Sequence, residues 1–173
     1  MMKFLSISAI LVVLDHATKY WAIVALKGQP YWPADGDLFR LDYAENYNMI
    51  FSLSFIPMPL VNALAIGAIG LLFYLLYQYK DQHVLPSVGL AFILGGAFGN
   101  IPERLIRGYV VDFISFDWPD WFFFTRWPTF NIADSAVNIG MILYLGYVFF
   151  IEGKEPKNSP VVSTNDTIES SAS

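Results

Sequence analysis

The sequence contains no cysteine, and this absence excludes several kinds of chemistry at once. Disulfides, thiolate nucleophiles and Cys-ligated metal sites all require that residue. Histidine is nearly absent too, because His16 and His83 are the only two and lie far apart in the chain. A His-rich zinc site is therefore improbable. We expect the protein to use no metal and no cofactor.

Charged residues are also scarce. They make up 14% of the 173 residues, whereas 55% are hydrophobic, and the mean hydropathy is +0.47. This composition is well above the apolar share of soluble domains and indicates a membrane protein. The formal net charge of −5 comes largely from loops and the C-terminal tail. It gives no reason to expect a nucleic-acid partner.

Four apolar stretches are long enough to cross a bilayer, whose core of about 30 Å needs about 20 helical residues. We predict an all-α membrane protein with four transmembrane helices and a small β-rich loop region outside the spans, in one domain over residues 1–153. The predicted spans are about 4–26, 58–79, 84–106 and 132–151, with loops at 27–57 and 107–131 and a disordered tail at 154–173. A cleaved signal peptide is the alternative for the first span, but no convincing cleavage site follows it.

The two long loops must share one side of the membrane if all four spans cross it. Lysine and arginine are balanced between the two sides, so charge alone leaves the orientation open. Residues 38–55 follow the turn signal "PADGD" and are rich in β-branched and aromatic residues, which predicts a short strand or hairpin. The second loop carries Trp118, Trp121, Phe122, Phe123, Phe124 and Trp127, a pattern typical of an aromatic belt at the lipid headgroups.

Two charged residues interrupt the first apolar stretch. Asp15 and Lys19 are four residues apart and can therefore pair on one face of a helix. Charges within a membrane span are costly and for that reason often functional. The alternative is an ion pair that only locks helix packing.

The third stretch contains glycines and then ends in polar residues. Gly95 and Gly99 have the small-xxx-small spacing that lets helices approach closely. Asn100, Glu103 and Arg104 follow, and either charged residue could neutralise a nearby partner. An ordinary helix end with snorkelling side chains is the other interpretation.

Two aspartates are expected at the same membrane surface. Asp112 follows "YVV", so the backbone there should be extended, and Asp134 begins the fourth span. Asn131 lies three residues before Asp134, either as a helix cap or on the same helical face. Apolar neighbours would raise the pKa of both carboxyls by desolvation. Each aspartate alone could be a cap or an interfacial charge, but together they suggest a paired acid and base.

Five segments occur in one order: "LDHATK", "NYNMIFS", "GGAFGNIPER", "GYVVDF" and "FNIADS". In that order and spacing they resemble the sequence boxes of the lipoprotein signal peptidase family, also called signal peptidase II. Members of that family are bacterial inner-membrane aspartyl peptidases. The resemblance spans nearly the whole folded chain.

The resemblance implies that Asp112 and Asp134 form a catalytic dyad. The supporting or substrate-binding positions that it implies are Asp15, Lys19, Asn46, Asn100, Arg104 and Asn131. The implied substrate is a prolipoprotein whose lipobox cysteine carries diacylglycerol, cut just before that cysteine to release the signal peptide. The implied location is the bacterial inner membrane, with cytoplasmic termini and an active site near the periplasmic face. Besides this substrate we expect contact with membrane lipid, no nucleic acid, and a monomer.

Two departures from the family's pattern stand out. Asn48, Met49 and Ile50 replace the usual glycine and small residues of the second box, and Glu103, behind Pro102, replaces the usual aspartate of the third. Neither touches the proposed dyad, so we expect altered substrate fit rather than lost chemistry.

Two other functions stay open at the level of the sequence. A small proton or ion translocator could use Asp15, Lys19, Glu103 and Arg104 as a relay. A catalytically silent paralogue would bind lipidated peptide without turnover.

Overall fold

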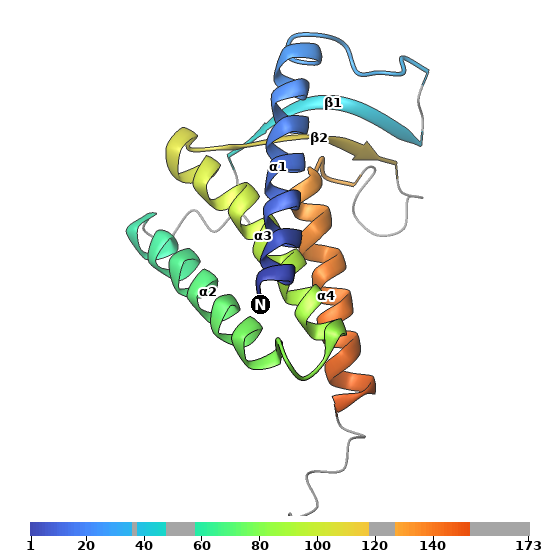
Figure 1. Cartoon of the computed structure of the whole chain (residues 1–173). Helices are drawn as coiled ribbons and strands as arrows, with labels where there is room; N and C mark the ends of the chain where they lie inside the picture. Colours follow the sequence, from blue (N-terminus) through green and yellow to red (C-terminus); the bar gives the residue numbers. More distant parts are fainter. Residues whose placement is uncertain (36–37, 48–57, 118–126, 153–173) are drawn as a thin grey trace, which may run out of the picture.

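The structure is a computed structural model that describes residues 1–35, 38–47, 58–117 and 127–152. Its elements, in chain order, are α1 (Met2–Ala25), β1 (Phe39–Asn46), α2 (Met58–Tyr79), α3 (Val84–Arg107), β2 (Val110–Phe116) and α4 (Ile132–Phe150). The helices lie side by side, and the two strands cross one end of them (Figure 1). The N-terminus and the turn between α2 and α3 lie at the other end.

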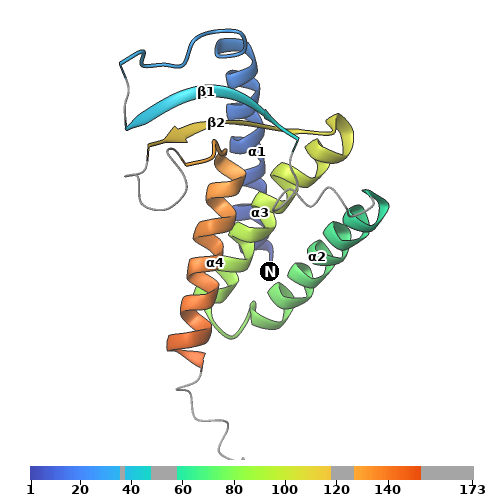
Figure 2. The same ribbon diagram turned by 180° about the vertical axis from the view of Figure 1, so that it is seen from behind.

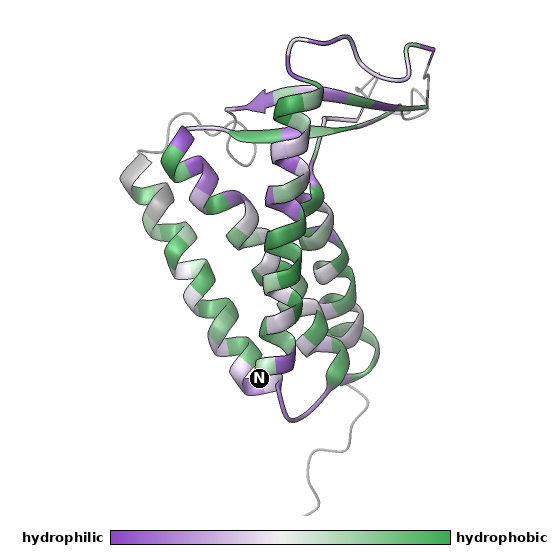
Figure 3. Cartoon of the chain, turned by 45° about the horizontal axis from the view of Figure 1, so that its top comes forward, coloured by the Kyte–Doolittle hydropathy of each residue, from purple (hydrophilic) through white to green (hydrophobic). Residues whose placement is uncertain are grey.

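In the described part of the chain, three helices are long and apolar enough to cross a membrane: α1, α3 and α4. Their surfaces are largely hydrophobic, whereas polar residues gather towards the strands (Figure 3). Helix α2 occupies the predicted second span, but its described apolar stretch, Ala63–Tyr79, is shorter than those of the other three helices. The mostly helical membrane fold is therefore confirmed, while a crossing by α2 stays a prediction.

Glycines on α3 allow it to pack closely against two neighbours. Gly95 and Gly99 face α1, where a Cβ at Gly99 would lie 2.8 Å from Asp15 Oδ2. Gly96 faces α4, where a Cβ would lie 2.4 Å from the carbonyl oxygen of Ala133. Gly95 and Gly99 thus allow the close approach of backbones that small residues permit between membrane helices. Gly96 adds a second face of close contact, towards α4. From behind, α3 runs between α1 and α4 (Figure 2).

Two hydrophobic clusters build the core. One joins the helices away from the strands and contains Phe4, Leu76, Leu90, Ala91 and Leu94. The other lies beneath the strands and contains Ala22, Leu26, Val111 and Phe113. The buried face of α1 passes through both and carries Asp15 and Lys19 between them. A polar layer is therefore enclosed between two apolar ones.

The strands β1 and β2 form a two-stranded antiparallel sheet in which Phe39 lies opposite Phe116 and Asn46 opposite Val110. The predicted strand in residues 38–55 is present as β1, but its partner comes from the second long loop. The rest of that segment lies outside the described residues. So do residues 118–126 of the predicted aromatic belt, the tail at 154–173 and the departures at 48–50. Trp127, at the edge of the belt, is exposed.

Candidate active site

Asp112 is buried on strand β2, with 2% of its surface exposed. Its extended backbone agrees with the prediction from the sequence. The antiparallel pairing brings the end of β1 alongside it, and Asn46 donates from Nδ2 to Asp112 Oδ2 at 2.8 Å. On the other side, Asn131 donates from Nδ2 to Asp112 Oδ1 at 2.7 Å. Both oxygens of this carboxyl therefore accept a hydrogen bond from an amide.

The pKa of Asp112 is raised to about 6. Desolvation by burial is the largest cause, because it disfavours the charged carboxylate. The hydrogen bond from Asn46 lowers the pKa, and the negative charge of Asp134 raises it further. The positive charge of Lys19 acts in the opposite direction. The two aspartates are thus close enough to influence each other's ionisation.

Asp134 lies in the first turn of α4, and Asn131 is the N-cap of that helix. Asn131 Oδ1 accepts the backbone N–H of Asp134 at 2.9 Å, and Asp134 Oδ2 accepts the backbone N–H of Asn131 at 3.2 Å. This reciprocal arrangement is a capping box, so Asn131 acts as a cap. The other oxygen, Asp134 Oδ1, accepts from Asn100 Nδ2 at 2.7 Å.

Asn131 connects the two aspartates directly. It is fully buried, and it donates to Asp112 through its side chain and to Asp134 through its backbone. Strand β2 and helix α4 therefore bring both carboxyls to one asparagine. All four carboxyl oxygens receive an N–H donor, so both groups are held in fixed orientations.

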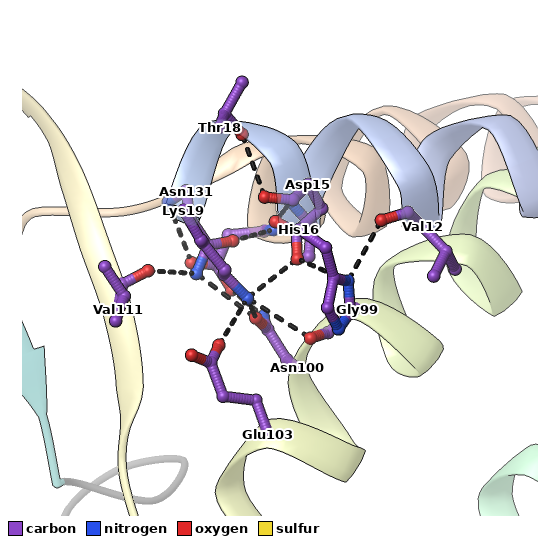
Figure 4. Close-up of polar contacts among 12 residues, drawn as sticks. Val12, Asp15, His16, Thr18, Lys19, Gly99, Asn100, Glu103, Val111 and Asn131 are labelled. Atoms are coloured by element: carbon purple, nitrogen blue, oxygen red, sulfur yellow. Dashed lines mark hydrogen bonds and ion pairs between the residues drawn. The ribbon is translucent and has the colours of Figure 1, made fainter. Parts of the chain in front are cut away.

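A buried cluster of charges surrounds Lys19 (Figure 4), and Asn100 links this cluster to Asp134. Lys19 Nζ lies 2.8 Å from Asp15 Oδ2 and 2.9 Å from Glu103 Oε2, which confirms the predicted pairing of Asp15 with Lys19. Lys19 also donates to Asn100 Oδ1 at 2.7 Å. Asp15 Oδ1 accepts the backbone N–H of Ala133 at 2.9 Å and so joins α1 to the start of α4.

Seven of the eight predicted site residues belong to this one network: Asp15, Lys19, Asn46, Asn100, Asp112, Asn131 and Asp134. Within residues 1–35, 38–47, 58–117 and 127–152, no hydrogen bond or ion pair links Arg104 to it. Its Nε is buried and has no hydrogen-bond partner among the described residues. In that part of the chain no group of three or more His, Cys, Asp or Glu side chains is placed to hold a metal ion.

Comparison with known proteins assigns the chain to a family. Residues 7–150 match the family model described as signal peptidase (SPase) II. The chain belongs to the signal peptidase II family. It is 35% identical to a lipoprotein signal peptidase of Psychromonas ingrahamii over 168 residues, 95% of this chain and 94% of the relative. It is 38% identical to one of Pelodictyon phaeoclathratiforme over 172 residues, 95% of this chain and 99% of the relative.

A solved structure shares the fold of this signal peptidase II family member. It is a bacterial membrane enzyme determined by the in meso method at 2.3 Å resolution. The TM-score is 0.71 at 24% identity, over 92% of this chain and 95% of that one. At this identity the match supports the helical arrangement and the small sheet.

Two features of the site were not among the predicted site residues. Glu103 was recognised as a possible counter-charge, and the structure places it against Lys19. Glu45 accepts from Lys27 Nζ at 2.9 Å, from Tyr43 Oη at 2.9 Å and from Tyr47 Oη at 2.7 Å. This second cluster anchors the end of β1 next to Asn46. Its signal in the sequence is the pair of tyrosines, Tyr43 and Tyr47, on either side of Glu45.

Proposed function

We propose that Asp112 and Asp134 are the catalytic pair with which this chain removes signal peptides from prolipoproteins. The supporting observation is that Asn131 hydrogen-bonds both carboxyls. Membership of the family supports an aspartic-type lipoprotein signal peptidase. The ion-relay alternative is not favoured, because Asp15, Lys19 and Glu103 form one closed ion-paired cluster.

Two neighbouring carboxyls cannot both ionise cheaply, so the pair shares one proton and titrates as a unit. The ionised member removes a proton from water, whose oxygen attacks the scissile carbonyl carbon. The protonated member donates to the carbonyl oxygen, which gives a neutral tetrahedral intermediate. When the C–N bond breaks, the carboxyl that took the proton from water gives it to the leaving amine. A hydroxyl of the intermediate returns its proton to the other carboxylate, so the pair again holds one proton.

The proposed substrate is a prolipoprotein whose cysteine carries diacylglycerol, cut just before that cysteine. Such a substrate holds its scissile bond at the membrane surface, because its signal helix and acyl chains are in the bilayer. Asp112 is on β2 and Asp134 is in the first turn of α4, so the pair lies where the strands meet the apolar helices, and this supports a site at the membrane surface. We further propose four crossings including α2, cytoplasmic termini, and a strand region on the periplasmic face of the inner membrane.

The test is cleavage by purified Asp112→Asn and Asp134→Asn enzymes. We expect each to lose at least about 10³-fold in kcat, since general acid–base catalysis contributes about 10²–10⁴-fold and the pair acts as one unit. The readout is release of the signal peptide from a diacylglyceryl-modified prolipoprotein. Asp81→Asn is the matched control, because Asp81 is exposed in the turn between α2 and α3. Wild-type cleavage by either dyad variant would refute the proposed mechanism.

A further inference from the structure

Among the described residues, Lys19 donates its hydrogen bonds to Gly99 and Asn100 on α3, and its counter-ions Asp15 and Glu103 are held as ion pairs. Four oxygens surround Nζ, which carries only three hydrogens. Hydrogen bonds go to Asn100 Oδ1 at 2.7 Å and to the carbonyl oxygen of Gly99 at 3.2 Å. Among the described residues, Asp15 Oδ2 and Glu103 Oε2 receive no aligned hydrogen bond and are held as ion pairs. The shortest contact of the ammonium is therefore the one to Asn100.

That contact decides which way the Asn100 amide faces. An ammonium can only donate, so Asn100 must turn its oxygen towards Lys19. Its NH₂ group then faces Asp134 and donates to Oδ1 at 2.7 Å. A reversed amide would point an oxygen at the Asp134 carboxyl, where two acceptors repel each other. Lys19 thus determines the donor that Asp134 meets.

Asn131 also donates to Asn100 Oδ1, but less effectively. Its two NH₂ hydrogens are divided among Asp112 Oδ1 at 2.7 Å, Asn100 Oδ1 at 3.2 Å and the carbonyl oxygen of Val111 at 3.3 Å. Lys19 is closer to Asn100 and carries a full charge, and charged donors make hydrogen bonds about twice as strong as neutral ones. Lys19 is the principal group that orients the Asn100 amide.

We propose that Lys19 is a positioning residue for catalysis: through Asn100 it keeps Asp134 as the hydrogen-bond-accepting, ionised member of the pair, which activates water. This inference rests on the proposed function of Asp112 and Asp134. It assigns the two roles, since Asp112 then holds the shared proton. Lys19 acts through Asn100, because among the described residues its own contacts are not with Asp112 or Asp134.

The environment of Lys19 makes its charge a selective influence on the pair. The charged and titratable groups that face this region are Asp15 and His16 from α1, Glu103, Arg104 and Arg107 from α3, Asp112 from β2 and Asp134 from α4. Lys19 is 3% exposed, so water screens its charge little. Its field reaches Asp112 as well, which agrees with its lowering effect on the pKa of that carboxyl.

The test compares Lys19→Met with wild type and with Lys80→Met, since Lys80 is a partly exposed lysine in the turn between α2 and α3, outside the site. We expect Lys19→Met to lose about 10- to 100-fold in kcat, because a misplaced catalytic group costs about that much, with KM changed less than about twofold. The acid limb of the kcat/KM profile should move up by about one pH unit, since the ionised pair loses its donor and its neighbouring charge. A purely structural role would lower the yield of folded enzyme and leave that limb in place.

A double-mutant cycle shows whether Lys19 acts through Asn100. Residual cleavage is measured under enzyme excess. In an Asn100→Ala background, adding Lys19→Met should lower the cleavage rate by less than about a further threefold. Additive losses in the two variants would overturn the inference.

Lys19→Met leaves two carboxylates without their cation, which is costly in a buried site. A second variant, Lys19→Met with Asp15→Asn and Glu103→Gln, is uncharged and keeps similar volumes. We expect it to fold and to show the same loss of kcat and the same shifted limb. Wild-type kcat and pH profile in either folded variant refute the role of Lys19. If Asp112→Asn and Asp134→Asn are inactive at the same time, the proposed function survives that failure.

Discussion

The two aspartates differ in what holds them, and this difference sets their chemistry. Asp112 accepts from two neutral side-chain amides, whereas Asp134 accepts from a helix-cap backbone N–H and from an amide that Lys19 orients. A backbone donor at a helix N-terminus and a nearby cation both favour a negative charge. These surroundings support the proposed asymmetric pair, in which Asp112 donates the proton and Asp134 accepts one.

The burial of Asp112 should also appear in the stability of the enzyme. Its pKa is about 6 in the folded protein and near 3.8 in the unfolded chain, so the folded state keeps a proton that the unfolded state has lost. Stability therefore increases as pH falls through 6, and the gain is complete below about 4. Its size is on the order of 2 to 3 kcal/mol, at about 1.4 kcal/mol per pKa unit.

This prediction is checked by thermal unfolding in detergent between pH 7.5 and 5. The wild type and the exposed-site variant Asp81→Asn should both unfold at higher temperature at pH 5, and Asp112→Asn should lack the part of this increase that Asp112 supplies. If the unfolding temperature of Asp112→Asn rises as much as that of the wild type, the Asp112 carboxyl does not titrate between about pH 7.5 and 5.

At the scale of elements, glycine contacts let α3 hold α1 and α4 at the site. A Cβ at Gly96 would lie 2.4 Å from the carbonyl oxygen of Ala133, at the start of the helix that carries Asp134. We expect Gly96→Ala to destabilise the protein by about 1 to 3 kcal/mol through overpacking and to lower cleavage by displacing α4.

The matched control is Gly67→Ala on α2, where nothing lies within 4 Å of the added Cβ. Alanine is preferred over glycine inside a helix by about 0.5 to 1 kcal/mol, so this variant should be as stable as wild type or more so. The measurement is the unfolding temperature together with the cleavage rate. Equal behaviour of the two variants would show that the α3–α4 contact is not close packed.

The sequence was informative where local rules decide the structure. Apolar length located the helices, and the spacing of Asp15 and Lys19 predicted their pairing. The partner of β1 was not predictable, because the pairing of strands far apart in the chain, such as Asn46 opposite Val110, is fixed only by the packed fold. The contact of Glu103 with Lys19 likewise depends on how closely α3 approaches α1, which no local pattern gives.

At the scale of the whole molecule, the site lies between two apolar clusters. The cluster around Leu90 joins the helices, and the cluster around Val111 packs the strands onto α1. The charged layer is therefore enclosed from both sides. Such enclosure strengthens each hydrogen bond and charge interaction in the layer. The proposed catalytic pair is at the strand end of the helices, because Asp112 is on β2 and Asp134 is in the first turn of α4. The turn between α2 and α3 lies at the opposite end (Figure 1).

The absence of cysteine makes this arrangement testable in the membrane, because single cysteines can be introduced into an otherwise thiol-free chain. Asp35 follows α1 and Asp81 follows α2, and both are exposed. If α2 crosses the membrane, the two positions lie on opposite sides. In intact cells with a permeable outer membrane, Asp35→Cys should then react with an impermeant maleimide, and Asp81→Cys only after the inner membrane is opened. Glu152→Cys should behave like Asp81→Cys, because α3 and α4 return the chain to the same side. Labelling of Asp35→Cys and Asp81→Cys from one side would leave α2 lying along the membrane and remove the four-span topology.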